Sequence, residues 1–247
     1  MIAFLAAVQF LLVSPAFVRR AFTPRELGQA AGFYPIVGLL LGALLALANL
    51  LLGHLFPVQV QSALVLTLWI GLTGALHFDG FLDACDGLFG GSTAEHRMEI
   101  MRDERTGAYA VAGGVLLLLT LFSSLSVLAD RSWAALLLAP ALGRWGMTMT
   151  LVAFPYARPA GLGRDVKDHA RTPQAVMATA TTLAAAFALA WFLHSVSPMM
   201  ALLSAGLILW ISARFILRRI PGMTGDTYGA INMLIEVGVL LTFVALR

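Results

Sequence analysis

One long run without charge constrains the fold of this chain most. From Leu27 to Phe78 the sequence contains no Asp, Glu, Lys or Arg. Over all 247 residues, 60% are hydrophobic and 12% are charged, and the mean hydropathy is +0.86, whereas soluble domains average about 25% charged residues. A single soluble core could not bury this much apolar surface. The sequence therefore predicts an all-α, polytopic transmembrane helical bundle, organised as one domain over residues 1–247.

Seven stretches reach the length of about 20 apolar residues that a helix needs to cross a bilayer. They are residues 33–53, 60–78, 107–129, 133–155, 174–195, 199–217 and 228–246. Residues 1–18 form an eighth apolar segment, whose charge follows its apolar part, unlike the charge of a signal peptide. We expect this segment to be retained, and Pro15 favours a position at the membrane interface. The spacing of Gly38 and Gly42 predicts close helix packing.

The basic residues lie in alternate connections between the predicted spans. Thirteen of the 16 Lys and Arg share one side: Arg19, Arg20, Arg25, Arg97, Arg102, Arg105, Arg158, Arg164, Lys167, Arg171, Arg214, Arg218 and Arg219. The other side has only Arg131 and Arg247. Cytoplasmic loops are enriched in Lys and Arg. We therefore expect a multi-pass protein of the bacterial cytoplasmic (inner) membrane, with its functional site facing the cytoplasm.

An acid-rich segment, HFDGFLDACDG, follows the uncharged run at residues 77–87. Asp79, Asp83 and Asp86 are spaced i, i+4 and i+7, which places them on one face of a helix. Like charges on one face repel, so the spacing predicts a bound cation, and oxygen ligands favour Mg²⁺ or Mn²⁺ over zinc. The alternative is a set of solvated residues at the end of a span. Cys85 points away from the acids, so we interpret it as a packing residue.

The segment EHRMEIMRDERTGAYA, residues 95–110, carries charges of both signs. One interpretation is local pairing on a helix, between Glu99 and Arg102. The other is phosphate binding, because Mg²⁺ is typically held by one or two carboxylates together with substrate phosphates. On that interpretation a phosphate-ester substrate would meet Arg97, Arg102 or Arg105, with Asp103 as a further carboxylate.

Charges occur at three other places. The basic loop at residues 156–173 contains Arg158. Contact with anionic lipid head groups explains its Lys167 and Arg171 at least as well as a role in a functional site does. Asp226, between two glycines before the last span, is either a helix N-cap or a fourth carboxylate of a metal site. Arg144 and Glu236 lie inside spans, where an unpaired charge costs at least a few kcal/mol. We expect Arg144 to meet a buried acid or a substrate anion.

Four motifs resemble the cobalamin synthase family, the adenosylcobinamide-GDP ribazoletransferases. The first, H-x-D-G-x-x-D-x-x-D-G, matches at His77, Asp79, Gly80, Asp83, Asp86 and Gly87. The second, E-I-M-(K/R)-D-x-R-x-G-x-Y-G, matches from Glu99 to Tyr109, with Ala110 in place of the last glycine. The third matches at Pro155, Arg158, Gly161 and Gly163, and the fourth at Thr224, Gly225, Asp226, Gly229 and Ala230. The N-terminal block is more divergent.

The resemblance implies a membrane-embedded, Mg²⁺-dependent phosphotransferase that acts in the last step of cobalamin assembly. Adenosylcobinamide-GDP would react with α-ribazole, or its 5′-phosphate, to give adenosylcobalamin, or its phosphate, and GMP. Asp79, Asp83 and Asp86 would hold the metal, completed by Asp103 or Asp226, and an acid such as Asp79 or Asp83, or His77, would accept the hydroxyl proton. The phosphates or the substrate anion would meet Arg97, Arg102, Arg105, Arg144 and Arg158.

Two other classes of protein share some of these features. A CDP-alcohol phosphotransferase would begin D-x-x-D-G-x-x-A-R, and Asp83 to Gly87 fit its first five positions, but Gly90 and Gly91 stand where Ala and Arg are required. A cation transporter places its acids near the membrane centre, often within inverted repeats, and none is visible. No basic patch interleaved with aromatic residues indicates nucleic-acid binding. The expected partners are the two substrates and the lipid bilayer, and a homo-oligomer is compatible with the sequence.

Overall fold

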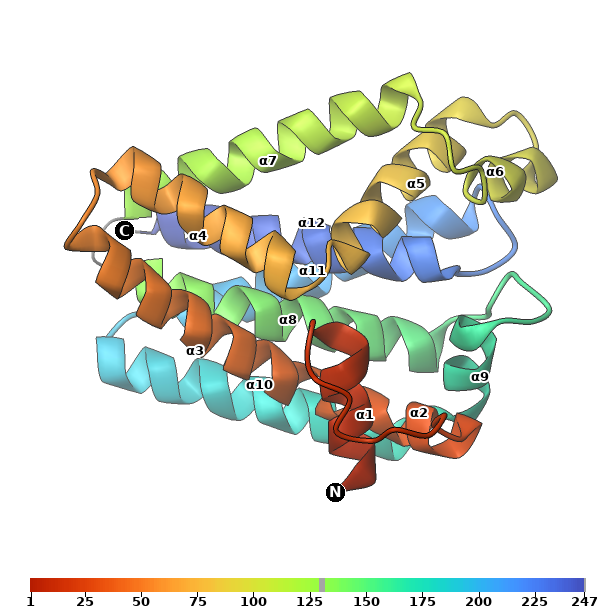
Figure 1. The fold of residues 1–247 in the computed structure, drawn as a ribbon, viewed down its shortest axis with the longest axis horizontal. Helices are drawn as coiled ribbons and strands as arrows, with labels where there is room; N and C mark the ends of the chain where they lie inside the picture. The colour runs from red at the N-terminus through yellow and green to blue at the C-terminus, as the bar shows by residue number, and fades with distance from the viewer. Residues whose placement is uncertain (129–131, 247) are drawn as a thin grey trace.

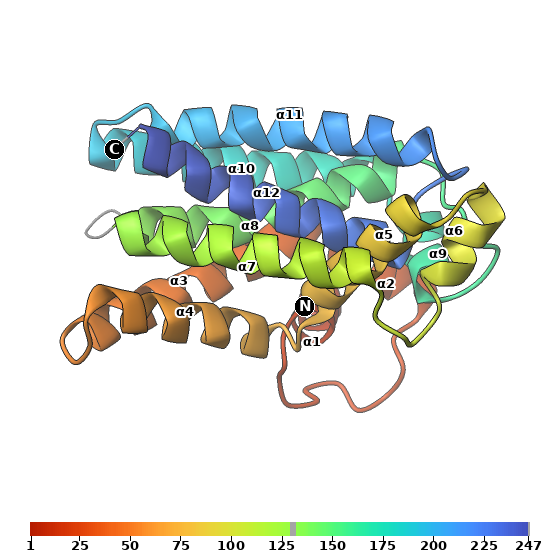
Figure 2. The same cartoon turned by 90° about the horizontal axis from the view of Figure 1, so that it is seen from above.

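The computed structural model describes residues 1–128 and 132–246, and these ranges contain helices and no β-strand. The helices are α1 (Ile2–Leu11), α2 (Pro24–Ala30), the 3-10 turn η1 (Ala31–Phe33), α3 (Tyr34–Gly53), α4 (Val58–Leu72), α5 (Leu76–Gly90), α6 (Ala94–Ile100), α7 (Ala108–Leu128), α8 (Ser132–Ala153), α9 (Leu162–His169), α10 (Thr172–Leu193), α11 (Ser197–Leu217) and α12 (Gly225–Ala245). The long helices run side by side along the longest axis of the molecule (Figures 1 and 2).

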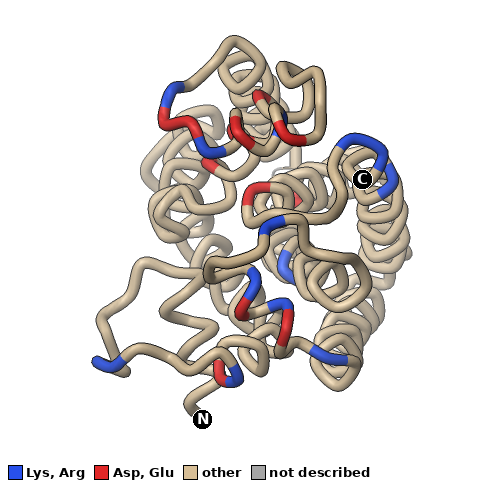
Figure 3. The backbone as a smooth tube through the Cα atoms, turned by 90° about the vertical axis from the view of Figure 1, so that its right-hand side faces the viewer, with Lys and Arg blue, Asp and Glu red and all other residues tan. Residues whose placement is uncertain are grey.

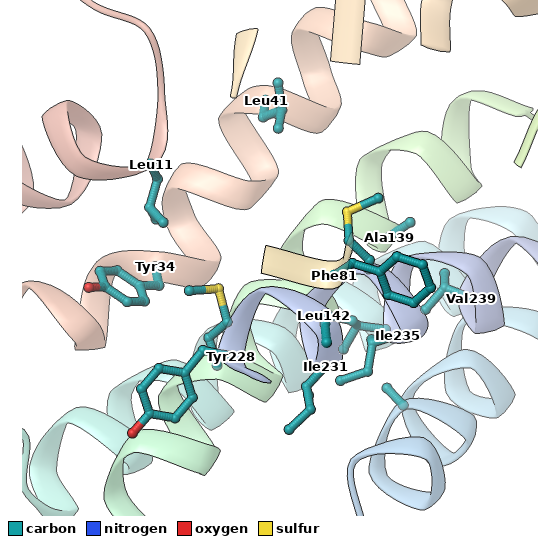
Figure 4. Close-up of a cluster of buried hydrophobic side chains, with 14 of the residues drawn as sticks. Leu11, Tyr34, Leu41, Phe81, Ala139, Leu142, Tyr228, Ile231, Ile235 and Val239 are labelled. Carbon is teal, nitrogen blue, oxygen red and sulfur yellow. The ribbon is translucent and has the colours of Figure 1, made fainter. Parts of the chain in front are cut away.

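Helices α8 and α12 lie at the centre of this bundle. Helix α8 packs against α3, α10, α11 and α12, and α12 also packs against α5, α7 and α11. Their facing residues, such as Leu142, Ile231 and Ile235, are fully buried and form the middle of the cluster in Figure 4. The outer helices instead expose large apolar side chains, including Phe187, Trp191 and Leu203, as expected where lipid replaces water around a bundle.

Six of the seven predicted spans are confirmed. Six helical segments are long and apolar enough to cross a membrane: Pro24–Gly53, Ala108–Leu128, Ser132–Ala153, Thr172–Leu193, Ser197–Leu217 and Gly225–Ala245. Their ends lie close to the predicted ones, except that α2 and η1 extend the first segment toward the N-terminus. Residue 129 of the predicted span 107–129, Arg131 and Arg247 lie outside the described residues.

The predicted span 60–78 is wrong as a single helix. Helix α4 ends at Leu72, and α5 continues at an angle of 88° to it. Gly74 and Ala75 both have φ of +57° at the break, a region that glycine enters freely and alanine rarely. The 15 residues of α4 rise only about 22 Å, short of the roughly 30 Å hydrocarbon core. Helix α5 therefore begins inside the bundle and carries the acids outward from there (Figure 1).

The N-terminal segment is a short helix that packs on the bundle. The ten residues of α1 are about 15 Å long, too short to cross a bilayer. Phe4 lies 5.9 Å from Phe33 and Phe10 lies 6.0 Å from Tyr34, measured between ring centroids. These contacts attach α1 to η1 and α3.

The prediction for Gly38 and Gly42 is confirmed, because both lie against α8. A Cβ atom built on Gly38 would be 2.5 Å from the Pro140 carbonyl oxygen, and one on Gly42 would be 2.6 Å from that of Leu136. Any larger side chain would push the two helices apart.

Most Lys, Arg, Asp and Glu residues lie toward one end of the bundle, which faces the viewer in Figure 3. We call this the charged end. It contains α2, α6 and α9 and the outer end of α5, which lie together at the right of Figure 1. Contacts tie these segments to one another: α2 packs on α9, α5 packs on α6, and the Arg97 guanidinium of α6 donates to the Arg219 carbonyl after α11.

Candidate active site

Two glycines allow α5 and α12 to cross closely at the charged end. A Cβ atom on Gly80 of α5 would lie 3.1 Å from both the Cα and the carbonyl oxygen of Asp226, and one on Gly229 of α12 would lie 3.0 Å from the His77 carbonyl oxygen. Small residues at such a crossing let helix backbones approach. The first and fourth motifs of the sequence are thus brought into direct contact.

A cavity of about 330 Å³ opens on the acid-bearing face of α5. We call it the charged cavity. Asp79 is exposed and Asp83 is half-buried in its wall. The segment after α6 supplies the opposite side with Arg102, Asp103, Glu104 and Arg105. Carboxylates and guanidinium groups thus face one another across a space open to solvent, as the sequence predicts for a phosphate-ester site.

Asp86 is committed to the backbone. Its carboxylate is buried and accepts hydrogen bonds from the Gly107 N–H at 2.6 Å and the Ala110 N–H at 2.9 Å. Gly107 immediately precedes α7 and Ala110 lies in its first turn, where the N–H groups have no partner within the helix. Asp86 therefore acts as the cap of α7 and anchors the loop that carries Arg102 and Arg105.

Asp103 is paired within its own loop. Its carboxylate accepts hydrogen bonds from the Arg105 side chain at 2.6 and 3.0 Å and from the Arg105 N–H at 3.1 Å. These hydrogen bonds, which stabilise the charged form, lower the pKa of Asp103 to about 2. Asp103 and Arg105 thus reach the charged cavity as one exposed ion pair.

Asp226 lies in the first turn of α12, and the interpretation of it as an N-cap is wrong. Thr224 is the cap, with its hydroxyl accepting from the Thr227 N–H. Asp226 instead accepts hydrogen bonds from the Arg158 guanidinium at 2.6 Å and the Thr224 hydroxyl at 3.2 Å. The pair is mostly buried, with 17% of each side chain exposed.

A second cavity, of about 320 Å³, is lined by the first residues of α5 and of α12. We call it the aromatic cavity, because Phe10, Tyr34, Tyr156 and Tyr228 line it together with the Arg158–Asp226 pair and His77. Asp79 belongs to the walls of both cavities. His77 is 3% exposed. The sequence predictions for His77, Asp79, Arg158 and Asp226 therefore meet in one place.

The carboxylates that remain available for a metal are fewer than the sequence predicts. Within residues 1–128 and 132–246, no three His, Cys, Asp or Glu side chains converge on a point that could hold an ion. Asp86, Asp103 and Asp226 are occupied by the partners described above. Asp79 and Asp83, one turn apart on α5, have no such partner among the described residues. Two carboxylates fit Mg²⁺, which takes one or two from a protein and fills its other positions with water and substrate oxygens.

The five arginines proposed for substrate binding separate into two groups. Arg102, Arg105 and Arg158 line the cavities, and Arg102 is exposed and forms no salt bridge with Glu99. Arg97 points to the Arg219 carbonyl at 3.2 Å. Arg144 is fully buried inside the bundle and pairs with Glu236 at 2.9 Å, so it meets the buried acid and not a substrate anion.

Lys167 has a structural role at the charged end that the sequence does not predict. Lys167 donates to the carbonyls of Leu151 and Val152 at 2.7 and 3.2 Å, and so caps the end of α8 and docks α9 on it. Its partial burial lowers the pKa of its ammonium.

The aromatic cavity was also not predicted from the sequence. Its four aromatic residues come from four separate segments, so no spacing in the sequence could have grouped them.

Comparisons with known proteins match the chain nearly from end to end. The family model described as cobalamin-5-phosphate synthase matches residues 3–244. The adenosylcobinamide-GDP ribazoletransferase of Stutzerimonas stutzeri is 42% identical over 243 residues, which cover 98% of this chain and 97% of that protein. The protein of the same name from Pseudomonas putida (strain W619) is 40% identical and covers 98% of each chain. No solved structure matches the chain. With the site motifs in place on α5, α6 and α12, the chain belongs to the cobalamin-5-phosphate synthase family.

Proposed function

We propose that the protein joins adenosylcobinamide-GDP and α-ribazole, or its 5′-phosphate, to form adenosylcobalamin, or its 5′-phosphate, and GMP. The match covers 95–98% of the length of relatives that carry this activity in their names. The observation that carries the proposal is the position of Asp79 in the walls of two adjoining cavities. A transferase that joins two substrates requires such a meeting point.

The bond changes are those of a phosphoryl transfer. The ribazole hydroxyl oxygen bonds to the cobinamide-linked phosphorus, the bond from that phosphorus to the bridging oxygen of the diphosphate breaks, and GMP leaves with that oxygen. Asp79 or Asp83 accepts the hydroxyl proton, a task for which a carboxylate at the site is suited. Arg102 and Arg105 bind the phosphate oxygens, because guanidinium groups form strong, charge-assisted hydrogen bonds with them.

We also propose that Asp79 and Asp83 hold Mg²⁺. When bound, the ion neutralises charge on the diphosphate oxygens. Arg158 fixes the side chain of Asp226 beside these carboxylates, and the Asp86 cap keeps the arginine-bearing loop over them.

The charged end is proposed to face the cytoplasm, where nucleotide substrates are available. Groups of basic residues mark this end in the sequence, and cytoplasmic loops carry such groups. We assign the protein to the inner membrane of a bacterium on this ground. The orientation is tested with single cysteines introduced at exposed His96 in α6 and at exposed Leu55 between α3 and α4. Each cysteine is labelled with a thiol reagent added to one side of the membrane and then to the other.

The activity is tested by GMP release from the purified protein in nanodiscs. The protein is incubated with adenosylcobinamide-GDP and α-ribazole, with and without Mg²⁺, and in parallel with a CDP-alcohol and an acceptor alcohol. GMP release that needs both α-ribazole and Mg²⁺ is expected. Release of CMP would assign the protein to the CDP-alcohol class, and no nucleotide release with uptake of cations into vesicles would indicate a transporter.

A further inference from the structure

We propose that the aromatic cavity binds the benzimidazole nucleoside and that the charged cavity binds the guanosine diphosphate end of the other substrate. This assignment rests on the proposed function and gives each substrate its own subsite. It also assigns a role in substrate binding to the N-terminal helix α1, because Phe10 of that helix lines the aromatic cavity.

Two stacked ring pairs form the walls of the aromatic cavity. Phe10 and Tyr34 lie 6.0 Å apart with their planes at 23°, and Tyr156 and Tyr228 lie 6.0 Å apart with their planes at 25°. All four rings line the cavity. Tyr34 and Tyr228 lie at one edge of the buried cluster in Figure 4, on α3 and α12, away from Ile235 and Val239. Walls of this kind favour a flat aromatic ligand, because stacking on such rings is worth roughly 1–3 kcal/mol per base.

Three polar atoms without a hydrogen-bond partner among the described residues belong to side chains that line this cavity, and each atom is buried. They are the His77 Nε2, the Arg158 Nε and the Tyr228 hydroxyl oxygen. His77 is 3% exposed and Tyr228 is 4% exposed. A buried polar group without a partner costs free energy, and such groups normally have one. Three such side chains around one cavity suit a ligand that carries several polar atoms, as the ribose and the ring nitrogen of a benzimidazole nucleoside do.

The size of the cavity selects between the two substrates. Its volume of about 320 Å³ is at the lower end of the roughly 300–1,000 Å³ typical of small-molecule sites. A nucleoside is of this size, whereas the corrin ring with its side chains is far larger. The corrinoid therefore has to stay outside, at the membrane surface of the charged end.

The polar groups select between the two bases. Guanine presents donors and acceptors along its whole edge, and each would need a partner on burial. The polar side chains of the aromatic cavity are Asp79, Arg158, Asp226, His77 and the tyrosine hydroxyls, and most of the remaining side chains that line it are apolar, such as Leu151 and Val166. Dimethylbenzimidazole has a single ring acceptor and two methyl groups, which suit such a wall. The charged cavity instead holds Arg102 and Arg105, the groups that a diphosphate requires.

Asp79, which lines both cavities, is the point where the two subsites meet. A ribazole seated between the ring pairs directs its ribose toward Asp79 and the Arg158–Asp226 pair. A diphosphate in the charged cavity reaches Asp79 as well. The hydroxyl and the phosphorus that react are thereby brought together at one carboxylate, which gains the advantage of proximity.

The assignment is tested by measuring the dissociation constants of α-ribazole and of GDP separately, by equilibrium dialysis with the full-length protein in nanodiscs. Tyr156→Leu removes one stacking ring and is expected to weaken α-ribazole binding about 5- to 150-fold. Tyr228→Phe removes one hydroxyl and is expected to weaken it roughly 2- to 12-fold. Neither change alters GDP binding. Arg102→Gln is expected to weaken GDP binding and to leave α-ribazole binding unchanged.

Trp191→Leu is the matched control for the loss of an aromatic ring, because Trp191 is exposed on α10, belongs to none of the four motifs and lines neither cavity. Loss of GDP affinity in Tyr156→Leu, with α-ribazole affinity retained, would place guanine in the aromatic cavity and overturn the assignment. Unchanged affinity for both ligands in Tyr156→Leu and Tyr228→Phe, in a protein that still releases GMP, would also overturn it and leave the proposed function intact. A wild-type protein that binds neither ligand and releases no GMP would refute the proposed function itself.

Discussion

Replacement of Glu236 tests whether Arg144 is a structural or a substrate-binding residue. Arg144 and Glu236 are 0% and 1% exposed, and their charged atoms lie 2.9 Å apart between α8 and α12. Glu236→Leu would leave the guanidinium buried without its acid. Breaking one half of a buried pair costs about 3–5 kcal/mol, whereas replacing both halves with apolar residues of similar volume is often neutral. The double variant Arg144→Met/Glu236→Leu should therefore recover most of the stability that Glu236→Leu loses.

The free energy of unfolding of each variant is measured by titration with a denaturing detergent in mixed micelles. GMP release by the folded double variant is measured at varied donor concentration. We expect a loss of about 3–5 kcal/mol in Glu236→Leu and a KM for adenosylcobinamide-GDP in the double variant close to that of the wild type. Two results would contradict the structural role: a loss below about 1 kcal/mol in the single variant, or a KM in the stable double variant that rises tenfold or more.

Three further predictions concern the framework of the site. Gly42→Val should cost at least about 1–3 kcal/mol by overpacking, because a Cβ atom at this position meets the α8 backbone at 2.6 Å. Gly206→Ala, with open space around it, should be neutral or stabilising by at most about 1 kcal/mol. The same detergent titration compares the two variants, and equal effects would refute the close packing of Gly42 on α8. Asp86→Ala should cost about 1–2 kcal/mol and speed hydrogen exchange at residues 107–112, and unchanged exchange there would contradict the cap of α7. The pKa of the Asp103 carboxyl should be about 2 by NMR and should rise toward the usual 3.9 in Arg105→Gln, which removes the guanidinium and keeps the backbone N–H donor. Because the folded pKa is lowered, the ion pair stabilises the loop fully above about pH 3.9, and this contribution is lost as the pH falls through about 2. A wild-type midpoint near 3.9 would show that the pair does not form.

Most of the framework could be predicted because hydropathy reports it directly. Six spans need only a count of apolar residues, and charge placement predicts one charged end. The break after Leu72 could not be predicted, because residues 60–78 carry no charge and the bend depends on Gly74 and Ala75 adopting positive φ. The position of Gly38 and Gly42 was readable, because small residues at that spacing have one common use in membrane helices.

The site was predictable residue by residue but not as an arrangement. The spacing of Asp79, Asp83 and Asp86 correctly puts them on one helix. Asp86, however, binds the N–H groups of Gly107 and Ala110 at the start of α7, and the sequence does not reveal that α7 begins beside α5. Arg144 finds its acid 92 positions away. The aromatic cavity needs α1, α3, α12 and the Tyr156 loop to meet, and such contacts appear only once the helices are packed.

GMP release by Asp79→Asn measures the central claim most directly. Asp79 is the residue that both cavities share, and the change removes its charge while keeping its shape. Turnover of saturating adenosylcobinamide-GDP and α-ribazole with Mg²⁺ should fall by about 10²- to 10⁴-fold, the usual contribution of a positioned acid or base. Asp168→Asn is the control, because that residue pairs with Arg164 on α9 and lines neither cavity, and it should keep wild-type turnover. Near-normal turnover in a folded Asp79→Asn protein would show that the two substrates do not meet at this carboxylate.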